Sequence, residues 1–336
     1  MKLAIWVDWL ALQFQSELRD TYPFRLEKLT YGSRQFRTLY DVYYFDDLWG
    51  HISADPVLPS LDKDFFLLKL ENSWLYRANC YESILSFQRA IGSQYKGISR
   101  VDLCGDFNAF KGNYNPASFI RRVMAGEVDN LSKTSVAAVR GPKGDDPFES
   151  LTMGSRASAV RTYLYNKTKE MKDVKWKEWI YEGDKAAGLD MSRDIWRLEV
   201  SLKAEATTYS DPESGELKEM MLCDLFRPDM LQIWYKDLIT KYFRFIPHST
   251  DSNRYRYNTL KLMDYSDVVI RRHVEKYDIT TSRADRIFAA KLAKETQESK
   301  RMRIQERFQV ITWAAQWIAE HQLTQYIHRR RLNTEL

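Results

Sequence analysis

Apolar and polar residues alternate cleanly in three stretches of the chain. They are SRVDLCGDF at 99–107, AVRTYLYNK at 159–167 and IWRLEVSLKAE at 195–205. Successive side chains of an extended strand point to opposite faces of a sheet, so each stretch predicts a strand with one apolar and one polar face. If the three strands lie in one sheet with their polar faces aligned, their ionisable side chains converge on a single surface.

The rest of the first 265 residues shows patterns typical of further strands and helices. Residues 148–167 read as a hairpin that turns at 154–158, where the sequence is GSRAS. The other expected elements are strands over 3–14, 36–45, 65–70 and 254–263, and helices over 81–95, 116–125, part of 169–190, and 217–243 with an interruption at Pro228.

Composition indicates a globular protein of a reducing compartment. Of 336 residues, 44% are hydrophobic, which is enough for the core of one large or two smaller domains. Three cysteines are too few for a disulfide framework or a structural zinc site. Asp8 interrupts the apolar start, and the apolar run 310–319 has about half the roughly 20 residues needed to cross a bilayer. We therefore expect a cytoplasmic protein without a membrane partner.

The basic residues are concentrated in the last 66 residues. Residues 271–336 contain 14 Lys and Arg against 8 Asp and Glu, whereas the whole chain has a net charge of only +5. From residue 282 the pattern is helical, with an apolar stripe expected to pack on the body of the protein or, alternatively, to form a homodimer. A cluster of basic side chains can contact the phosphates of a DNA backbone, and the alternative is a solvated helix face. The residues concerned are Arg271, Arg272, Lys300, Arg301 and Arg303.

The polar faces of the three strands carry the candidate chemistry. They display Asp102 and Asp106 on the first strand, Arg161, Tyr163, Tyr165 and Lys167 on the second, and Arg197, Glu199 and Lys203 on the third. Carboxylate oxygens suit Mg²⁺ or Mn²⁺, and the five histidines include no pair at metal-binding spacing. A tyrosine beside cations suits attack on a phosphate, because the cations favour the phenolate. Solvated strand faces and surface ion pairs are the alternatives.

In order and spacing, the runs SRVDLCGDF, TMGSRASAVRTYLYNKTKE and WRLEVSLK resemble the Rep_trans-type replication initiators of rolling-circle plasmids and filamentous phages. The resemblance is specific over 99–203 and extends over 1–265. It implies an α+β fold in which helices back an antiparallel sheet, as a duplicated variant of the rolling-circle endonuclease fold. Residues 1–265 would form the nicking and strand-transfer domain, and 266–336 a basic helical segment for DNA binding or dimerisation.

Matched by position, the resemblance implies Tyr165 as the nucleophile, because Asn166 and Lys167 follow it. It also implies a Mg²⁺ or Mn²⁺ site formed by Asp102, Asp106 and Glu199. The cations expected to contact DNA or the transition state are Arg161, Lys167 and Arg197, joined by Arg100, Arg156 and Lys203.

Two departures from the family pattern leave alternatives open. Two more residues than usual separate Arg161 from the Tyr-Asn-Lys triplet, which makes Tyr163 a rival nucleophile or a second one. Asp102 and Asp106 would lie about 13 Å apart in an ideal strand, so both can bind one ion only if Gly105 bends the strand.

The resemblance implies an enzyme that nicks one DNA strand at an origin, forms a 5′-phosphotyrosine bond, frees a 3′-OH and later religates the strand. Its partners would be origin DNA and a host helicase and polymerase, in a bacterium carrying the plasmid, phage or mobile element. The alternatives are a conjugative relaxase with the same chemistry, a tyrosine recombinase that joins a 3′-phosphate without metal, and a DNA-binding regulator without catalysis.

Overall fold

The two longest strands lie side by side in the middle of one large sheet. In the computed structural model, which describes residues 1–270 except 133–134, 141–146, 212, 252 and 254–255, β1 (Lys2–Gln15) pairs antiparallel with β6 (Gln94–Phe107). Apart from 45–47, these residues belong to one compact unit. No helix in the described part is long and apolar enough to span a bilayer.

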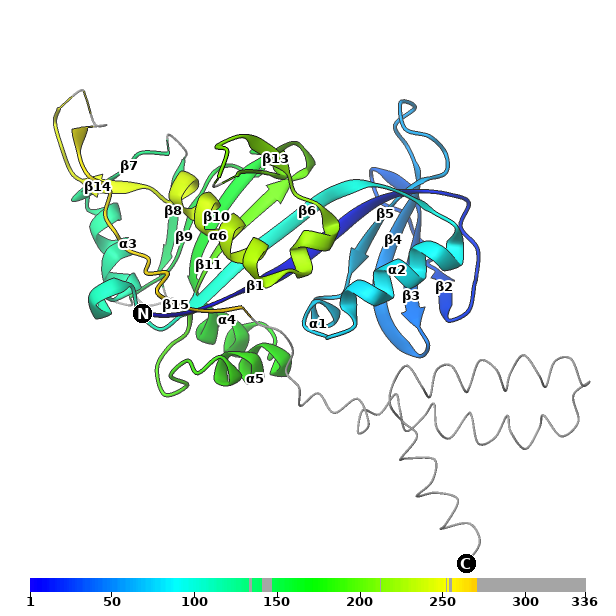
Figure 1. Ribbon diagram of the computed structural model, residues 1–336, viewed down its shortest axis with the longest axis horizontal. Helices are drawn as coiled ribbons and strands as arrows, with labels where there is room; N and C mark the ends of the chain where they lie inside the picture. The colour runs from blue at the N-terminus through cyan, green and yellow to red at the C-terminus, as the bar shows by residue number, and fades with distance from the viewer. Residues whose placement is uncertain (133–134, 141–146, 212, 252, 254–255, 271–336) are drawn as a thin grey trace, which may run out of the picture. The chain divides into compact units, whose positions relative to one another are not determined.

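The sheet follows the same path on both sides of this central pair. On one side the order is β1-β5-β4-β3-β2, and on the other it is β6-β11-β10-β9-β8, so each half pairs its first strand with its last (Figure 1). The bounds are β2 Phe24–Lys28, β3 Phe36–Tyr44, β4 Asp47–Pro56, β5 Phe65–Leu70, β8 Val136–Arg140, β9 Phe148–Met153, β10 Val160–Asn166 and β11 Trp196–Lys203. The antiparallel sheet that the resemblance implied is therefore present.

Shorter pairings complete the strands. The strand β15 (Asp267–Ile270) runs parallel to the start of β1. It falls after residue 265, so this part of the predicted C-terminal segment pairs with the main sheet. Two small sheets pair β12 (Thr208–Ser210) with β13 (Leu217–Glu219), and β7 (Val128–Asn130) with β14 (Phe245–Pro247).

Two helices cross the face of the sheet that is turned toward the viewer in Figure 1. There α2 lies over the strands of the first half, and α6 lies over those of the second half. The helices are α1 Asn72–Leu75, α2 Cys80–Ile91, α3 Pro116–Met124, α4 Lys167–Asp173, α5 Glu178–Ala186 and α6 Pro228–Tyr242, with short 3-10 turns η1 Lys111–Asn113, η2 Ala204–Ala206 and η3 Leu222–Phe226.

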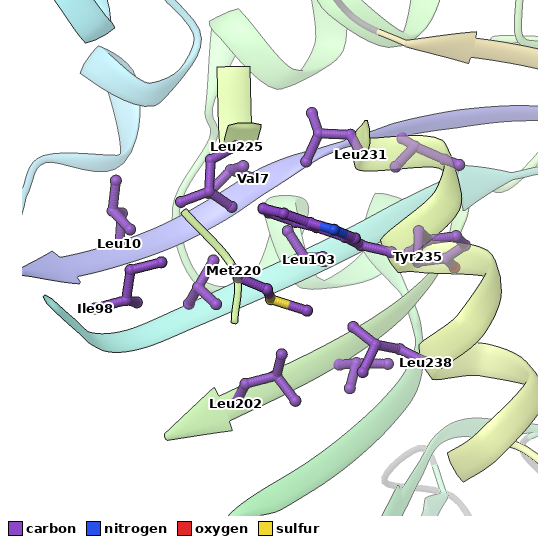
Figure 2. Packing of buried hydrophobic residues seen from close by; sticks show 14 of the residues in the cluster. Val7, Leu10, Ile98, Leu103, Leu202, Met220, Leu225, Leu231, Tyr235 and Leu238 are labelled. Carbon is purple, nitrogen blue, oxygen red and sulfur yellow. The ribbon is translucent and has the colours of Figure 1, made fainter. Parts of the chain in front are cut away.

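The main core continues under both α2 and α6, and the part that positions the site lies where α6 packs on the central strands. Leu231, Tyr235 and Leu238 of α6 meet apolar side chains of β1, β6 and β11 (Figure 2). Gly105 lets the helix approach closely, because a Cβ at this position would come within 2.5 Å of the Tyr235 hydroxyl. That hydroxyl donates a hydrogen bond to the Leu198 carbonyl at 3.0 Å, which fixes the helix on the sheet.

Most predicted elements form, and the differences have local causes. The strands expected at 3–14, 36–45 and 65–70 are present, and the helix at 81–95 ends early because Gly92 takes a left-handed conformation with φ 70°. Pro228 begins α6 instead of interrupting a helix, since proline suits the first helical turn. Residues 217–219 form a strand, and the described residues within 254–263 contain none.

Candidate functional site

The three strands with polar faces are neighbours in the sheet, in the order β6-β11-β10. Arg197 of β11 lies opposite Asp106 of β6 and opposite Tyr165 of β10, and Glu199 lies opposite Tyr163. The polar face that they share is largely buried, with Asp106 and Arg197 at 0% exposure and Asp102 at 3%. The interpretation of Asp102 and Asp106 as a solvated pair is therefore wrong.

A hydrogen bond joins the predicted nucleophile to a carboxylate with an unusual affinity for protons. The Tyr165 hydroxyl donates to Glu199 Oε2 at 3.1 Å. Burial, with the Asp102 and Asp8 carboxylates nearby, raises the pKa of Glu199 to about 8. Burial and the Glu199 carboxylate also raise the pKa of Tyr165 well above its usual value. The phenol therefore needs a base to lose its proton at neutral pH, and Glu199 is in contact with it.

Arg197 holds two carboxylates from different halves of the sheet. Its Nε and Nη2 donate to the two oxygens of Asp106, both at 2.7 Å, and Nη1 lies 2.7 Å from Asp8 Oδ1. Burial lowers the pKa of Arg197, but Asp106 and Asp8 outweigh it and keep the guanidinium charged. The Arg197 guanidinium is thus buried and bound to two carboxylates. In this arrangement it cannot make the predicted contact to DNA.

Asp8 of β1 also belongs to the site, although no motif in the sequence indicated it. A register shift in the β1–β6 ladder falls between Val7 and Trp9, and this bulge turns Asp8 toward Arg197. Asp8 also accepts hydrogen bonds from Tyr76 and Asn72. Burial raises the pKa of Asp8, but Arg197, Lys167 and the hydrogen bond from Tyr76 together more than offset this, so the pKa lies below its usual range. A lone aspartate inside an otherwise apolar strand was the signal available in the sequence.

The other predicted carboxylate, Asp102, is bound by an arginine on its own strand. Arg100 donates through Nε and Nη2 to the two oxygens of Asp102, at 2.9 and 2.6 Å, and through Nε to Ser201 at 3.1 Å. Burial nevertheless raises the pKa of Asp102, because the low-dielectric surroundings outweigh the pairing. The Arg100 side chain keeps 39% exposure, so it lies at the rim of the site.

The Tyr165-Asn166-Lys167 triplet spans a junction between a strand and a helix. Asn166 caps α4 by accepting a hydrogen bond from the Lys169 amide at 2.9 Å. The Lys167 ammonium is buried, lies 5.5 Å from the centre of the Tyr165 ring and pairs with Glu170 at 2.7 Å. This cap fixes the point at which the chain leaves the sheet, and so places a buried cation beside the phenol.

Tyr163 shares the face of Tyr165 but has a different environment. The Arg161 guanidinium lies 4.7 Å from the centre of its ring, and burial raises the pKa of the phenol. Tyr165, in contrast, has a carboxylate in direct hydrogen-bonding contact. The geometry therefore gives Tyr165 a proton acceptor, and its role as the nucleophile stays a prediction.

The remaining predicted DNA contacts have different positions. Lys203 donates to the carbonyls of Arg156 and Ala157, at 3.2 and 3.0 Å, and so ties the β9–β10 turn to β11. Arg156 is exposed at this turn, which leaves it accessible to a ligand. Five of the predicted DNA contacts lie outside the described part of the chain: Arg271, Arg272, Lys300, Arg301 and Arg303.

The predicted metal triad does not fit this geometry. Both oxygens of Asp106 are held by Arg197 in a fully buried pair, and no bulge interrupts the ladder between β6 and β11 at Gly105. In the described part of the chain, no three His, Cys, Asp or Glu side chains are arranged to hold an ion. Of the predicted ligands, Asp102 and Glu199 lie on the face of the sheet that carries the tyrosines, whereas Asp106 pairs with Arg197.

Comparison with known proteins gives a weak likeness to solved structures and nothing at the level of sequence. No protein-family model and no curated protein matches the chain. A solved structure of a rolling circle replication initiator protein from Geobacillus stearothermophilus is similar over 77% of this chain and 92% of its own length, with 14% identity and a TM-score of 0.44. The site geometry therefore carries the functional proposal.

Proposed function

We propose that this chain is a DNA strand transferase that initiates rolling-circle replication with Tyr165 as its nucleophile. The observation that carries the proposal is the hydrogen bond between the Tyr165 phenol and Glu199, whose pKa of about 8 suits proton transfer near neutral pH. The motif resemblance supports DNA as the substrate. On this proposal the two halves of the sheet arose by duplication, and the second half supplies the nucleophile.

The chemistry follows from the contacts of the phenol. Glu199 takes the proton of Tyr165, and the phenolate oxygen attacks a DNA phosphorus. A bond forms between that oxygen and phosphorus while the bond from phosphorus to the 3′ oxygen breaks. The leaving 3′ oxygen takes up a proton, which Glu199 can return, and becomes the 3′-OH that a polymerase extends. The reverse reaction religates the strand, because the phosphotyrosine bond keeps the energy of the broken bond.

The surrounding cations have separate roles in this proposal. Lys167 lies beside the Tyr165 ring and favours the phenolate. Arg161 is only partly buried on the same face and is a candidate contact for the phosphate. Arg197 acts as a positioning residue, because it locks Asp106 and Asp8 in the sheet beneath the phenol. The requirement for Mg²⁺ or Mn²⁺ stays a prediction, and no step above depends on it.

A labelling experiment tests the proposal. End-labelled single-stranded DNA from the chain's own replication origin is incubated with the full chain, with either Mn²⁺ or EDTA, and the adduct is mapped by mass spectrometry. We expect a 5′-phosphotyrosine adduct on Tyr165, loss of the adduct in Tyr165→Phe and its retention in Tyr163→Phe. An adduct on Tyr163 would reassign the nucleophile. A 3′-phosphotyrosine, or no adduct under either condition, would overturn the proposed function.

A further inference from the structure

A tryptophan next to the tyrosine site lies between two cations from different strands. Trp9 is on β1, and its neighbours β5 and β6 supply Lys69 and Arg100. The Lys69 ammonium lies 4.1 Å from the centre of the indole ring, and the Arg100 guanidinium carbon lies 4.7 Å from it. Both distances are within the range of cation–π attraction. The indole therefore holds two positive charges in place on the sheet.

This cluster shares the sheet face of the tyrosines. Trp9 lies opposite Asp102 on β6, Asp102 lies opposite Ser201 on β11, and Ser201 lies opposite Arg161 on β10. Three strand spacings separate β1 from β10, or about 14 Å at the usual spacing of neighbouring strands. A single strand of DNA that crosses the sheet from the tyrosines would therefore reach Trp9 within a few nucleotides.

The two cations keep donors for an anion. Arg100 pairs with Asp102 through Nε and Nη2, so this pairing does not use Nη1. Within the part of the chain that the structure describes, Lys69 makes no direct hydrogen bond or ion pair with a carboxylate, and its ammonium rests on the indole. The carboxylate nearest to it in sequence, Glu71, accepts a hydrogen bond from His51 at 2.7 Å. The negative charge beside Lys69 is thus already paired.

The helices between residues 1 and 270 leave this part of the sheet accessible. The core clusters bury Leu10 and Leu12 on the face that α2 and α6 cover, whereas Trp9, Lys69 and Arg100 are only partly buried on the other face. Residues of α4 and α5 pack on Trp6 and Cys104, further toward the start of β1. Trp9 is not part of any of these buried clusters.

We infer that Trp9, Lys69 and Arg100 form a binding subsite for the single-stranded DNA that extends from the tyrosine site. This inference rests on the proposed function. Lys69 and Arg100 contact backbone phosphates, and the indole between them gives an aromatic surface to a sugar or base. Such an arrangement binds without reading sequence, because every nucleotide offers a phosphate and an apolar surface. The first half of the chain would then bind the DNA strand that the second half cuts.

Equilibrium binding to a fluorescein-labelled single-stranded oligonucleotide of the origin sequence tests this subsite. We expect Trp9→Leu to weaken binding at least fivefold, as loss of an aromatic contact usually does. Lys69→Gln should reduce the slope of log affinity against log salt by about 0.7, as expected for one lost contact to a single strand. Arg89→Gln, an exposed cation of α2 on the opposite face, is the matched control and should bind as the unaltered chain does.

Photo-crosslinking gives a readout that does not depend on the fold of a variant. Oligonucleotides with 5-bromodeoxyuridine at successive positions from the nick are irradiated with the unaltered chain, and the crosslinked peptides are identified by mass spectrometry. We expect a crosslink to the peptide of Trp9 from a position a few nucleotides from the nick. The subsite is wrong if the chain nicks through Tyr165 but does not crosslink at Trp9, and if Lys69→Gln leaves the salt dependence of DNA binding unchanged. If it crosslinks there without nicking, the proposed catalysis is wrong and the subsite stands.

Discussion

Replacing Glu199 by glutamine tests the central contact of the site. The pKa of Glu199 is raised from 4.5 to about 8 in the folded chain, mainly by burial. Between these two pH values, Glu199 therefore keeps its proton in the folded chain but has lost it in the unfolded chain. Stability decreases as pH rises through this window, because the unfolded state is favoured by ionisation. Glutamine cannot ionise and removes the effect.

The size of the change can be worked out from the shift. A rise of the pKa from 4.5 to about 8, at 1.36 kcal/mol per pKa unit, sets an upper limit of about 5 kcal/mol. We expect about 2 to 3 kcal/mol, because the Glu199 side chain keeps some contact with solvent, which screens the effect. Catalysis should change in the opposite direction. The nicking rate should rise with pH up to about 8, as Glu199 becomes the base, and Glu199→Gln should lower it about 10²- to 10⁴-fold.

Urea unfolding of the unaltered chain and of Glu199→Gln at pH 5, 7 and 8.5 measures the free energy of unfolding. Single-turnover nicking over the same pH range measures the rate. The free energy of unfolding of Glu199→Gln should match that of the unaltered chain near pH 5 and exceed it at pH 8.5. Glu219→Gln, at an exposed position on β13, is the control. A stability difference that is the same at every pH would show that the pKa of Glu199 is not raised by folding. A nicking rate in Glu199→Gln that keeps the original pH profile would show that Glu199 is not the base.

Two further substitutions test the buried framework. Arg197→Met removes the guanidinium that pairs with the buried Asp106 and Asp8 carboxylates and should cost about 3 to 5 kcal/mol in urea unfolding. Stability restored by Mn²⁺ would instead show that these carboxylates bind metal. Gly105→Ala places a Cβ within 2.5 Å of the Tyr235 hydroxyl and should cost about 1 to 3 kcal/mol by thermal unfolding, and an unchanged midpoint would show that α6 can shift.

Alternation along the chain predicted which side chains share a face. Asp102 and Asp106 do lie on one face of β6, and Tyr163 and Tyr165 on one face of β10, because the side-chain period of a strand is two whatever its neighbours are. Alternation did not predict burial. A polar face is expected to be solvated unless its side chains have partners. Here the Arg197 guanidinium donates two hydrogen bonds to Asp106, which offset the cost of burying that carboxylate.

The local pattern of residues therefore predicted the strands and their two faces, and the motif resemblance indicated the candidate nucleophile. The tertiary structure decided which of these residues meet. It places β11 between β6 and β10, so that Glu199 reaches Tyr165, and it bulges β1 so that Asp8 reaches Arg197. The physical reason is that periodicity depends only on the local backbone, whereas ion pairs and raised pKa values depend on register and burial between strands far apart in the chain.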